Sequence, residues 1–184
     1  MEMLVALGLF SVVVVIATDL FSTFQKISRK TESLQQLTSD SRFITETIAR
    51  YVRENTIDYS GYASPIVGAQ ETLRLRTRDQ DAILIAAAED CFVGDGPPFS
   101  CVTLTRGGTT ERISGSKVWI KTLRFYIAPD QNPFTFDADN GQYLANAQPQ
   151  VTVFLSIANN LNPAAENYTK YDVQTTITNR IYTR

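Results

Sequence analysis

The sequence predicts an α+β protein in which one long N-terminal helix packs on an antiparallel β-sheet. Residues 1–54 contain no proline and a single glycine, Gly8, and their apolar residues recur at helical spacing. From residue 70 onward, short segments with strand-like alternation are separated by turns rich in Gly, Pro, Asn and Asp. Chains in which a helical part precedes a run of strands form α+β folds, with the helix covering one face of the sheet.

Composition limits the classes of function. With 17 Lys and Arg against 19 Asp and Glu, the net charge is −2, so bulk charge provides neither a basic surface for nucleic acid nor an acidic tail. The chain has no His and only two Cys, which removes the commonest general base and most ligand sets for transition metals. We therefore expect a protein that is not an enzyme, that needs no cofactor and that has no specific nucleic-acid partner.

The strongest feature is an apolar segment close to the start. Residues 3–17 carry no charge. A helix needs roughly 20 residues to cross a bilayer, and the following residues can extend the lipid-compatible segment along one face. These are Thr18, Leu20, Phe21 and Phe24. The segment favours a membrane anchor or a subunit of an apolar assembly.

Two other interpretations of this segment fit less well. A secretory signal peptide begins with positive charge and ends at a small-residue cleavage site, whereas here Glu2 stands at the start and Ala17-Thr18-Asp19 follows the apolar run. A helix in the core of a globular domain shows polar residues at helical spacing, and residues 12–16 contain none.

The predicted helix is apolar on all sides in its first third and amphipathic in the rest. From residue 20 to residue 52, apolar residues recur at steps dominated by three and four, while charged residues occupy the remaining faces. One continuous helix of about 80 Å over residues 2–54 is the simplest interpretation at 1.5 Å per residue. We expect residues 1–24 to form the anchor and residues 25–184 the globular domain, made of the amphipathic half of the helix (25–57) and a sheet within 70–184. The amphipathic half should pack on its own domain, and the apolar third should lie in lipid or among copies of itself.

Seven segments are expected to form strands. Residues 72–78 alternate apolar with basic residues, and Gly107 and Gly108 supply the positive φ of a hairpin turn. Pro129 ends the strand that precedes it, and an Asn-rich loop separates the last two strands. The predicted strands are 72–78, 82–87, 101–105, 110–113, 117–128, 150–157 and 171–182.

The two cysteines, Cys91 and Cys101, enclose a turn-rich loop. If the domain lies outside the cytoplasm, a disulfide is expected, and it would lower the entropy of the unfolded chain by roughly 2–3 kcal/mol. Two buried thiols are the alternative. A metal site would need two further soft ligands, and the chain has no His.

One loop is a weak candidate for calcium. Asp137, Asp139 and Asn140 supply oxygen ligands close to Gly141. The loop does not match the twelve-residue calcium-binding pattern, because no Glu stands at the closing position. The same residues are also the ordinary choice for a tight turn, which is the simpler interpretation.

Residues 2–16 carry a family resemblance. They read EMLVALGLF, followed by Ser11 and five β-branched apolar residues. This run resembles the start of a mature type IV pilin or pseudopilin, a family whose N-terminus is often followed by Thr-Leu-Ile-Glu, and Glu2 corresponds to that glutamate. The resemblance implies removal of a short leader by a membrane peptidase and methylation of the new N-terminus. Met1 stands where the family usually has Ile, so the resemblance applies from Glu2 onward. The C-terminal strands resemble those of minor pilin-like subunits more weakly.

The resemblance implies a structural subunit of a type IV pilus-like filament. In such filaments the glutamate pairs with the N-terminal amine of a neighbouring subunit, so that a costly charge in an apolar environment is neutralised. The alternative is that Glu2 is an ordinary flanking charge at the level of the lipid headgroups. The assembly residues expected beside Glu2 are Leu4, Val5, Leu7, Leu9, Phe10, Val13 and Ile16.

The same resemblance implies partners and location. The expected partners are copies of the chain itself, membrane lipid before assembly, and the pilus assembly machinery. The expected location is an extracellular filament on the cell surface, after anchoring in the cytoplasmic membrane. Two alternatives stay open: a minor pseudopilin of a type II secretion-type pseudopilus, and a membrane-anchored extracytoplasmic enzyme or binding module.

Overall fold

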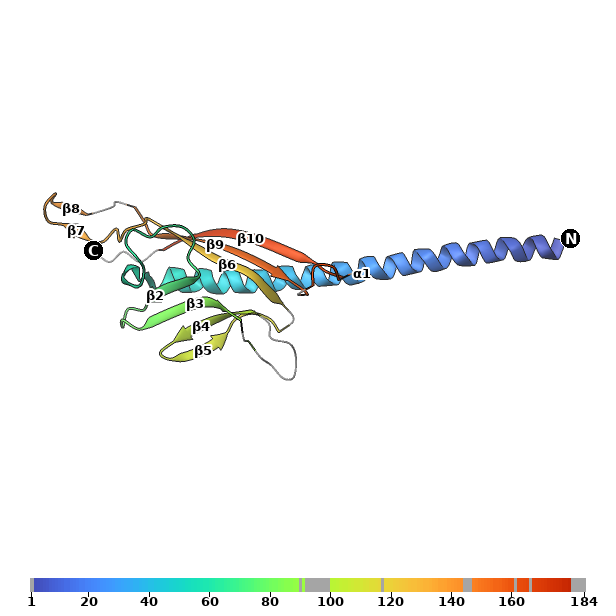
Figure 1. Cartoon of the computed structure of the whole chain (residues 1–184), viewed down its shortest axis with the longest axis horizontal. Helices are drawn as coiled ribbons and strands as arrows, with labels where there is room; N and C mark the ends of the chain where they lie inside the picture. The colour runs from blue at the N-terminus through green and yellow to red at the C-terminus, as the bar shows by residue number, and fades with distance from the viewer. Residues whose placement is uncertain are drawn as a thin grey trace.

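A computed structural model shows an elongated molecule, with a globular part at one end and a long helix projecting from it (Figure 1). The structure describes residues 2–89, 91, 100–116, 118–143, 147–160, 162–165 and 167–179, and the side chains of residues 2, 4, 5 and 6 lie outside this description. The predicted α+β class, with one N-terminal helix packed on antiparallel sheet, is confirmed.

The helix, α1 (Glu2–Glu54), is continuous over 53 residues. It ends at Asn55, whose side-chain amide donates to the carbonyl of Tyr51 at 2.9 Å. The carbonyl of Asn55 in turn accepts a 2.7 Å hydrogen bond from the side-chain amide of Asn179. Because Asn55 and Asn179 are both buried, this contact ties the end of the helix to the segment that follows the last strand.

Three antiparallel sheets follow the helix. The larger two have the strand orders β1-β2-β3-β4-β5 and β10-β9-β6, and the third is the β7-β8 hairpin. An isolated bridge between Gln70 and Phe125 joins the two larger sheets. The strands are β1 (Thr56–Ile57), β2 (Thr72–Arg76), β3 (Ala82–Ala88), β4 (Cys101–Arg106), β5 (Thr109–Arg112), β6 (Trp119–Ala128), β7 (Phe136–Asp137), β8 (Gln142–Tyr143), β9 (Gln150–Ala158) and β10 (Lys170–Thr178).

All seven predicted strands are present, with small differences at their ends. The first predicted strand stops at Arg76 rather than at residue 78, because Thr77 begins a turn in which its amide donates to the carbonyl of Asp81 at 2.9 Å. The last stops at Thr178, and residues 180–184 lie outside the described part of the chain. β1, β7 and β8 were not predicted, because strands of two residues show no periodicity.

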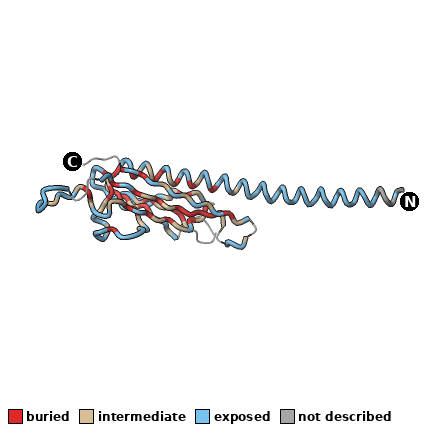
Figure 2. Tube along the Cα trace, turned by 90° about the horizontal axis from the view of Figure 1, so that it is seen from above, coloured by how far each residue is buried: buried red, intermediate tan, exposed pale blue. Residues whose placement is uncertain are grey.

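The core lies between the helix and the two larger sheets. Leu37, Ile44, Ile48 and Val52 of α1 are at most 1% exposed. They recur at steps of four or seven residues, so they form one face of the helix. The alternating residues of the strands complete the core, which includes Leu73, Leu75, Ile83, Ile85, Phe125, Val153, Leu155 and Ile157. Figure 2 shows that burial on α1 is confined to the half that the globular part covers.

The loop that follows β5 approaches the helix closely at Asp40. The guanidinium of Arg112 donates to the carbonyl of Gly115, and Gly115 lies so close to Asp40 of α1 that a Cβ there would stand 2.8 Å from the carboxylate. Burial raises the pKa of Asp40, and the positive charge of Arg112 partly opposes that shift. Glycine is therefore needed at position 115 for the backbone to approach the helix.

Candidate assembly surface

The first part of α1 projects from the globular part as a rod, defined here as residues 2–32 (Figure 1). Every described side chain of the rod is exposed, and burial on the helix begins at Ser33. The helix is long and apolar enough to cross a membrane, and its most apolar window is 0% buried. This geometry agrees with the expectation that the apolar third of the helix does not pack on its own domain. The division of the chain at residue 24 stays a prediction.

The predicted assembly residues lie along this rod. Leu7, Leu9, Phe10, Val13 and Ile16 are between 54% and 70% exposed. The side chains of the other three predicted residues, Glu2, Leu4 and Val5, lie outside the described part of the structure. Glu2 is the first residue of α1, and its pairing with a neighbour stays a prediction.

Exposure of the apolar side chains of the rod to water is unfavourable in free energy. Thirteen large apolar side chains are exposed along it, and burial of each such side chain is worth on the order of 1.5–3 kcal/mol. Their summed cost exceeds the roughly 5–15 kcal/mol by which a typical domain is stable. The side chains are Met3, Leu7, Leu9, Phe10, Val12, Val13, Val14, Val15, Ile16, Leu20, Phe21, Phe24 and Ile27. The rod therefore needs a cover from outside this chain, either lipid or protein.

The end of the rod next to the domain has two distinct faces. We call residues 19–32 the neck. Asp19, Lys26 and Lys30 are separated from one another and from the buried Leu37 by four, seven, eleven or eighteen residues. Each separation is close to a whole number of helical turns, so the three residues lie on the same side of α1 as the core.

The apolar residues of the neck point elsewhere. Phe21 and Phe24 lie roughly half a turn from the core side and are 63% and 68% exposed. Leu20 and Ile27 are 66% and 59% exposed. Ile27 belongs to the half of the helix, residues 25–57, that was expected to pack on the domain, but its side chain is exposed because burial on α1 begins only at Ser33. The neck thus directs its apolar face away from its own domain.

The two cysteines form the predicted disulfide. Cys91 and Cys101 are bonded, with their Cα atoms 5.9 Å apart, and residues 92–99 of the enclosed loop lie outside the described part of the chain. Cys101 begins β4, is fully buried and pairs with Ala88 at the end of β3. The bridge therefore fixes the end of the β3-β4 ladder.

Removing this disulfide is expected to destabilise the globular part without unfolding it. The Cys91→Ser/Cys101→Ala double variant should lose about 2–3 kcal/mol in free energy of unfolding, because the unfolded chain regains the freedom of the loop. Denaturant unfolding, followed by tryptophan fluorescence, measures the change. Reductant should lower the unfolding midpoint of the unsubstituted chain and leave that of the variant unchanged. Equal midpoints for both proteins without reductant would contradict this role.

The calcium candidate forms a hydrogen-bonded turn between β7 and β8. The carboxylate of Asp137 accepts hydrogen bonds from the side-chain amide of Asn140 at 2.7 Å and from the backbone amide of Asp139 at 3.0 Å. The bond from the Asn140 side chain is the largest cause of the lowered pKa of Asp137. Within the described residues, no group of three or more acidic, His or Cys side chains is placed to hold a metal. Calcium binding by Asp137, Asp139 and Asn140 stays a prediction.

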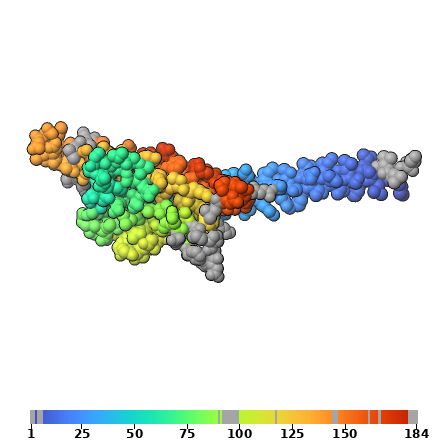
Figure 3. All heavy atoms as spheres, viewed as in Figure 1, coloured from blue at the N-terminus to red at the C-terminus, as the bar shows by residue number. Residues whose placement is uncertain are grey.

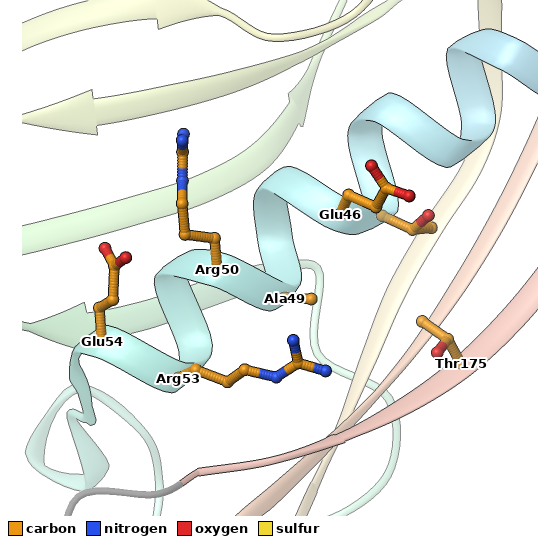
Figure 4. Close-up of a pocket in the computed structure, with 7 residues that line it drawn as sticks. Glu46, Ala49, Arg50, Arg53, Glu54 and Thr175 are labelled. Atoms are coloured by element: carbon orange, nitrogen blue, oxygen red, sulfur yellow. The ribbon is translucent and has the colours of Figure 1, made fainter.

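A shallow groove of about 470 Å³ lies between α1 and β10 (Figure 4). Its lining mixes both signs of charge, with Arg53 directed toward the β10 side and Arg50 and Glu54 pointing away from it. Thr175 is the lining residue from β10. A shallow groove lined by side chains of both charges does not indicate one class of ligand.

Comparison of the chain with protein-family models, curated proteins and solved structures found no match.

Proposed function

We propose that this chain is a structural subunit of a type IV pilus-like extracellular filament, and that it polymerises through the rod of α1. The observation that carries the proposal is the apolar rod, which is exposed along its whole described length at the opposite end from the β7-β8 hairpin. A helix that is apolar on all sides is stable in lipid or among similar helices. The resemblance of residues 2–16 to mature pilins selects the second environment as the final one.

The proposed assembly exchanges lipid for protein. Before assembly, the rod lies in the cytoplasmic membrane, with the basic residues of the neck close to the headgroups. During assembly, rods of neighbouring copies pack together, and Phe21, Phe24 and Ile27 continue that contact because they face away from the domain. Apolar contact is non-directional, so it supplies adhesion but not register.

Glu2 supplies the register in this proposal. A carboxylate among apolar helices costs several kcal/mol unless a positive charge neutralises it. Pairing with the N-terminal amine of a neighbour is possible in one register only, so that other registers are selected against. The chain would be anchored in the cytoplasmic membrane first and would lie in a cell-surface filament afterwards.

Shearing tests this function. Cells that produce the chain are expected to release, on mechanical shearing, a polymer that contains it, visible as thin filaments by electron microscopy. Mass spectrometry of the polymer should locate the processed N-terminus and show whether it is methylated. A high copy number distinguishes a main building block from a minor pseudopilin, which would be rare. Recovery of the chain only as membrane-bound monomer, in cells whose other filaments are intact, would refute the proposal.

A further inference from the structure

The β7-β8 hairpin protrudes from the end of the molecule that is furthest from the N-terminus (Figures 1 and 3). Figure 2 shows it on the domain side of the line that α1 follows. The rings of Phe136 and Tyr143 contact edge to face, with centroids 5.4 Å apart, yet they are 55% and 53% exposed. An exposed aromatic pair on a protruding hairpin is typical of contact surfaces, because rigid rings lose little entropy on burial.

The tip of this hairpin is acidic. Asp137 and Asp139 lie within its turn, and the Asp137 carboxylate is engaged in the hydrogen bonds of the turn itself. The carboxylate of Asp139 makes no ion pair with any residue that the structure describes. The Asp137 carboxylate is therefore used within the turn, whereas the Asp139 carboxylate can form an ion pair with a partner.

The neck carries the complementary charge. Lys26 and Lys30 lie on the domain side of α1, and Arg29 stands next to Lys30 in sequence. Asp19 lies on the same side but about 16 Å from Lys30 along the helix, so the charge around Arg29 and Lys30 is positive. Arg29 and Lys30 make no ion pair with the residues described here. This basic surface lies below the globular part, while the acidic hairpin lies beyond its opposite end, so one copy of the chain cannot bring them together.

We propose that the hairpin of one copy docks on the neck of a second copy that points in the same direction, with Asp139 facing Arg29 and Lys30, and Phe136 and Tyr143 covering the adjacent polar side of the helix. This inference rests on the proposed function, because it requires copies aligned in parallel. The hairpin lies at the end of the molecule that is furthest from the N-terminus, and the neck lies on the N-terminal side of the globular part, so parallel copies displaced along the helix can bring the two together (Figure 1).

The length of α1 sets a lower limit for the distance, measured along the helix, between two copies joined in this way. Lys30 and Glu54, the last residue of α1, are separated by about 36 Å at 1.5 Å per residue. The hairpin lies beyond the end of α1, so copies joined in this way are displaced along the helix by more than about 36 Å (Figure 1).

The charges of Asp139, Arg29 and Lys30 determine whether neighbouring copies stack in parallel or reversed, and they add little to the affinity of the contact. An exposed ion pair contributes roughly 0–1 kcal/mol, whereas reversed stacking would place like charges opposite each other. The two aromatic rings contribute most of the apolar area that the contact buries. The rods supply adhesion to the filament, and the hairpin would supply an outer contact that keeps all domains pointing one way.

Cysteine cross-linking in assembled material tests this contact. The full chain with Asp139→Cys and Lys30→Cys should, after mild oxidation of sheared polymer, give a ladder of multiples of 20.5 kDa on a non-reducing gel. The two positions are too far apart within one chain to bridge, since a disulfide needs Cα atoms within about 7 Å. The matched control is Asp139→Cys with Ser28→Cys, because Ser28 lies on the opposite side of the neck, and it should give no ladder.

The outcomes separate this inference from the proposed function. Normal polymer from the Asp139→Cys/Lys30→Cys chain without a ladder would overturn the inference and leave the filament proposal standing. Failure of the unsubstituted chain to form any polymer would overturn both. If the cysteine variant does not assemble, charge reversal replaces it: Asp139→Lys should lower polymer yield several-fold, and adding Lys30→Asp should restore it. Equal yields for the single and the combined variant would overturn the inference.

Discussion

Residues 28–184 alone are expected to form a soluble monomer, whereas the full chain is expected to need lipid or detergent to stay dispersed. The cut removes all thirteen exposed large apolar side chains of the rod and none of the core, which begins at Leu37. Since buried apolar area is the main source of stability, the fragment should keep the free energy of unfolding of the complete globular part. Light scattering with size-exclusion chromatography measures its mass, and denaturant unfolding measures its stability.

The control for this fragment is the full chain in detergent micelles, in which the globular part should unfold at the same denaturant concentration. Agreement between the two would show that the rod contributes nothing to the stability of the domain. Aggregation of a fragment that is still folded would contradict the prediction. It would place the adhesive surface on the domain itself, for example at the exposed Tyr126 of the β10-β9-β6 sheet.

Glu2→Ala is expected to abolish or disorder the polymer while leaving the globular part unchanged. Glu2 is far along the helix from Leu37, the first core residue, so its removal should not alter the unfolding transition. Without the carboxylate, the N-terminal amine of a neighbour has no partner in the apolar bundle, and no register is favoured over another. Polymer yield and filament regularity, measured by shearing and electron microscopy, report the effect.

Two further variants test whether the charge of Glu2, and not its size or any other carboxylate, is responsible. Glu2→Gln keeps the shape of the side chain and removes its charge, so it should fail in the same way as Glu2→Ala. Glu32→Ala removes a carboxylate from the exposed neck, and polymer of normal yield is expected from it. Normal filaments from Glu2→Ala would reject charge pairing as the source of register, while the apolar contact between rods would remain possible.

Most of the fold is predictable from the sequence because its signals are local. The helix over residues 2–54 follows from the absence of proline and the spacing of apolar residues, and it ends as predicted at Asn55. The β4-β5 hairpin follows from Gly107 and Gly108, both of which have positive φ. The disulfide was expected for a domain outside the cytoplasm, because Cys91 and Cys101 enclose a turn-rich loop and the chain lacks the further soft ligands of a metal site, and the structure contains it.

The remaining features depend on contacts distant in sequence. The division of the strands into two larger sheets, and the bridge between Gln70 and Phe125 that joins them, depend on which strands pair, and residue periodicity contains no information about such pairing. Ile27 was expected to pack on the domain with the rest of residues 25–57, but it lies about a quarter turn from the side of Leu37 and is exposed. A helical projection that compares the side of each apolar residue with the side of the core would have found this. The β7-β8 hairpin was not predicted, because each of its strands is only two residues long and shows no periodicity.

The most direct measurement is an electron cryomicroscopy map of the sheared polymer at a resolution that separates individual helices. The rods of neighbouring copies are expected to lie side by side along the filament centre, with their apolar side chains in mutual contact and the globular parts outside. Rods that are separated from one another in the finished filament, or that are each surrounded by phospholipid, would contradict this expectation.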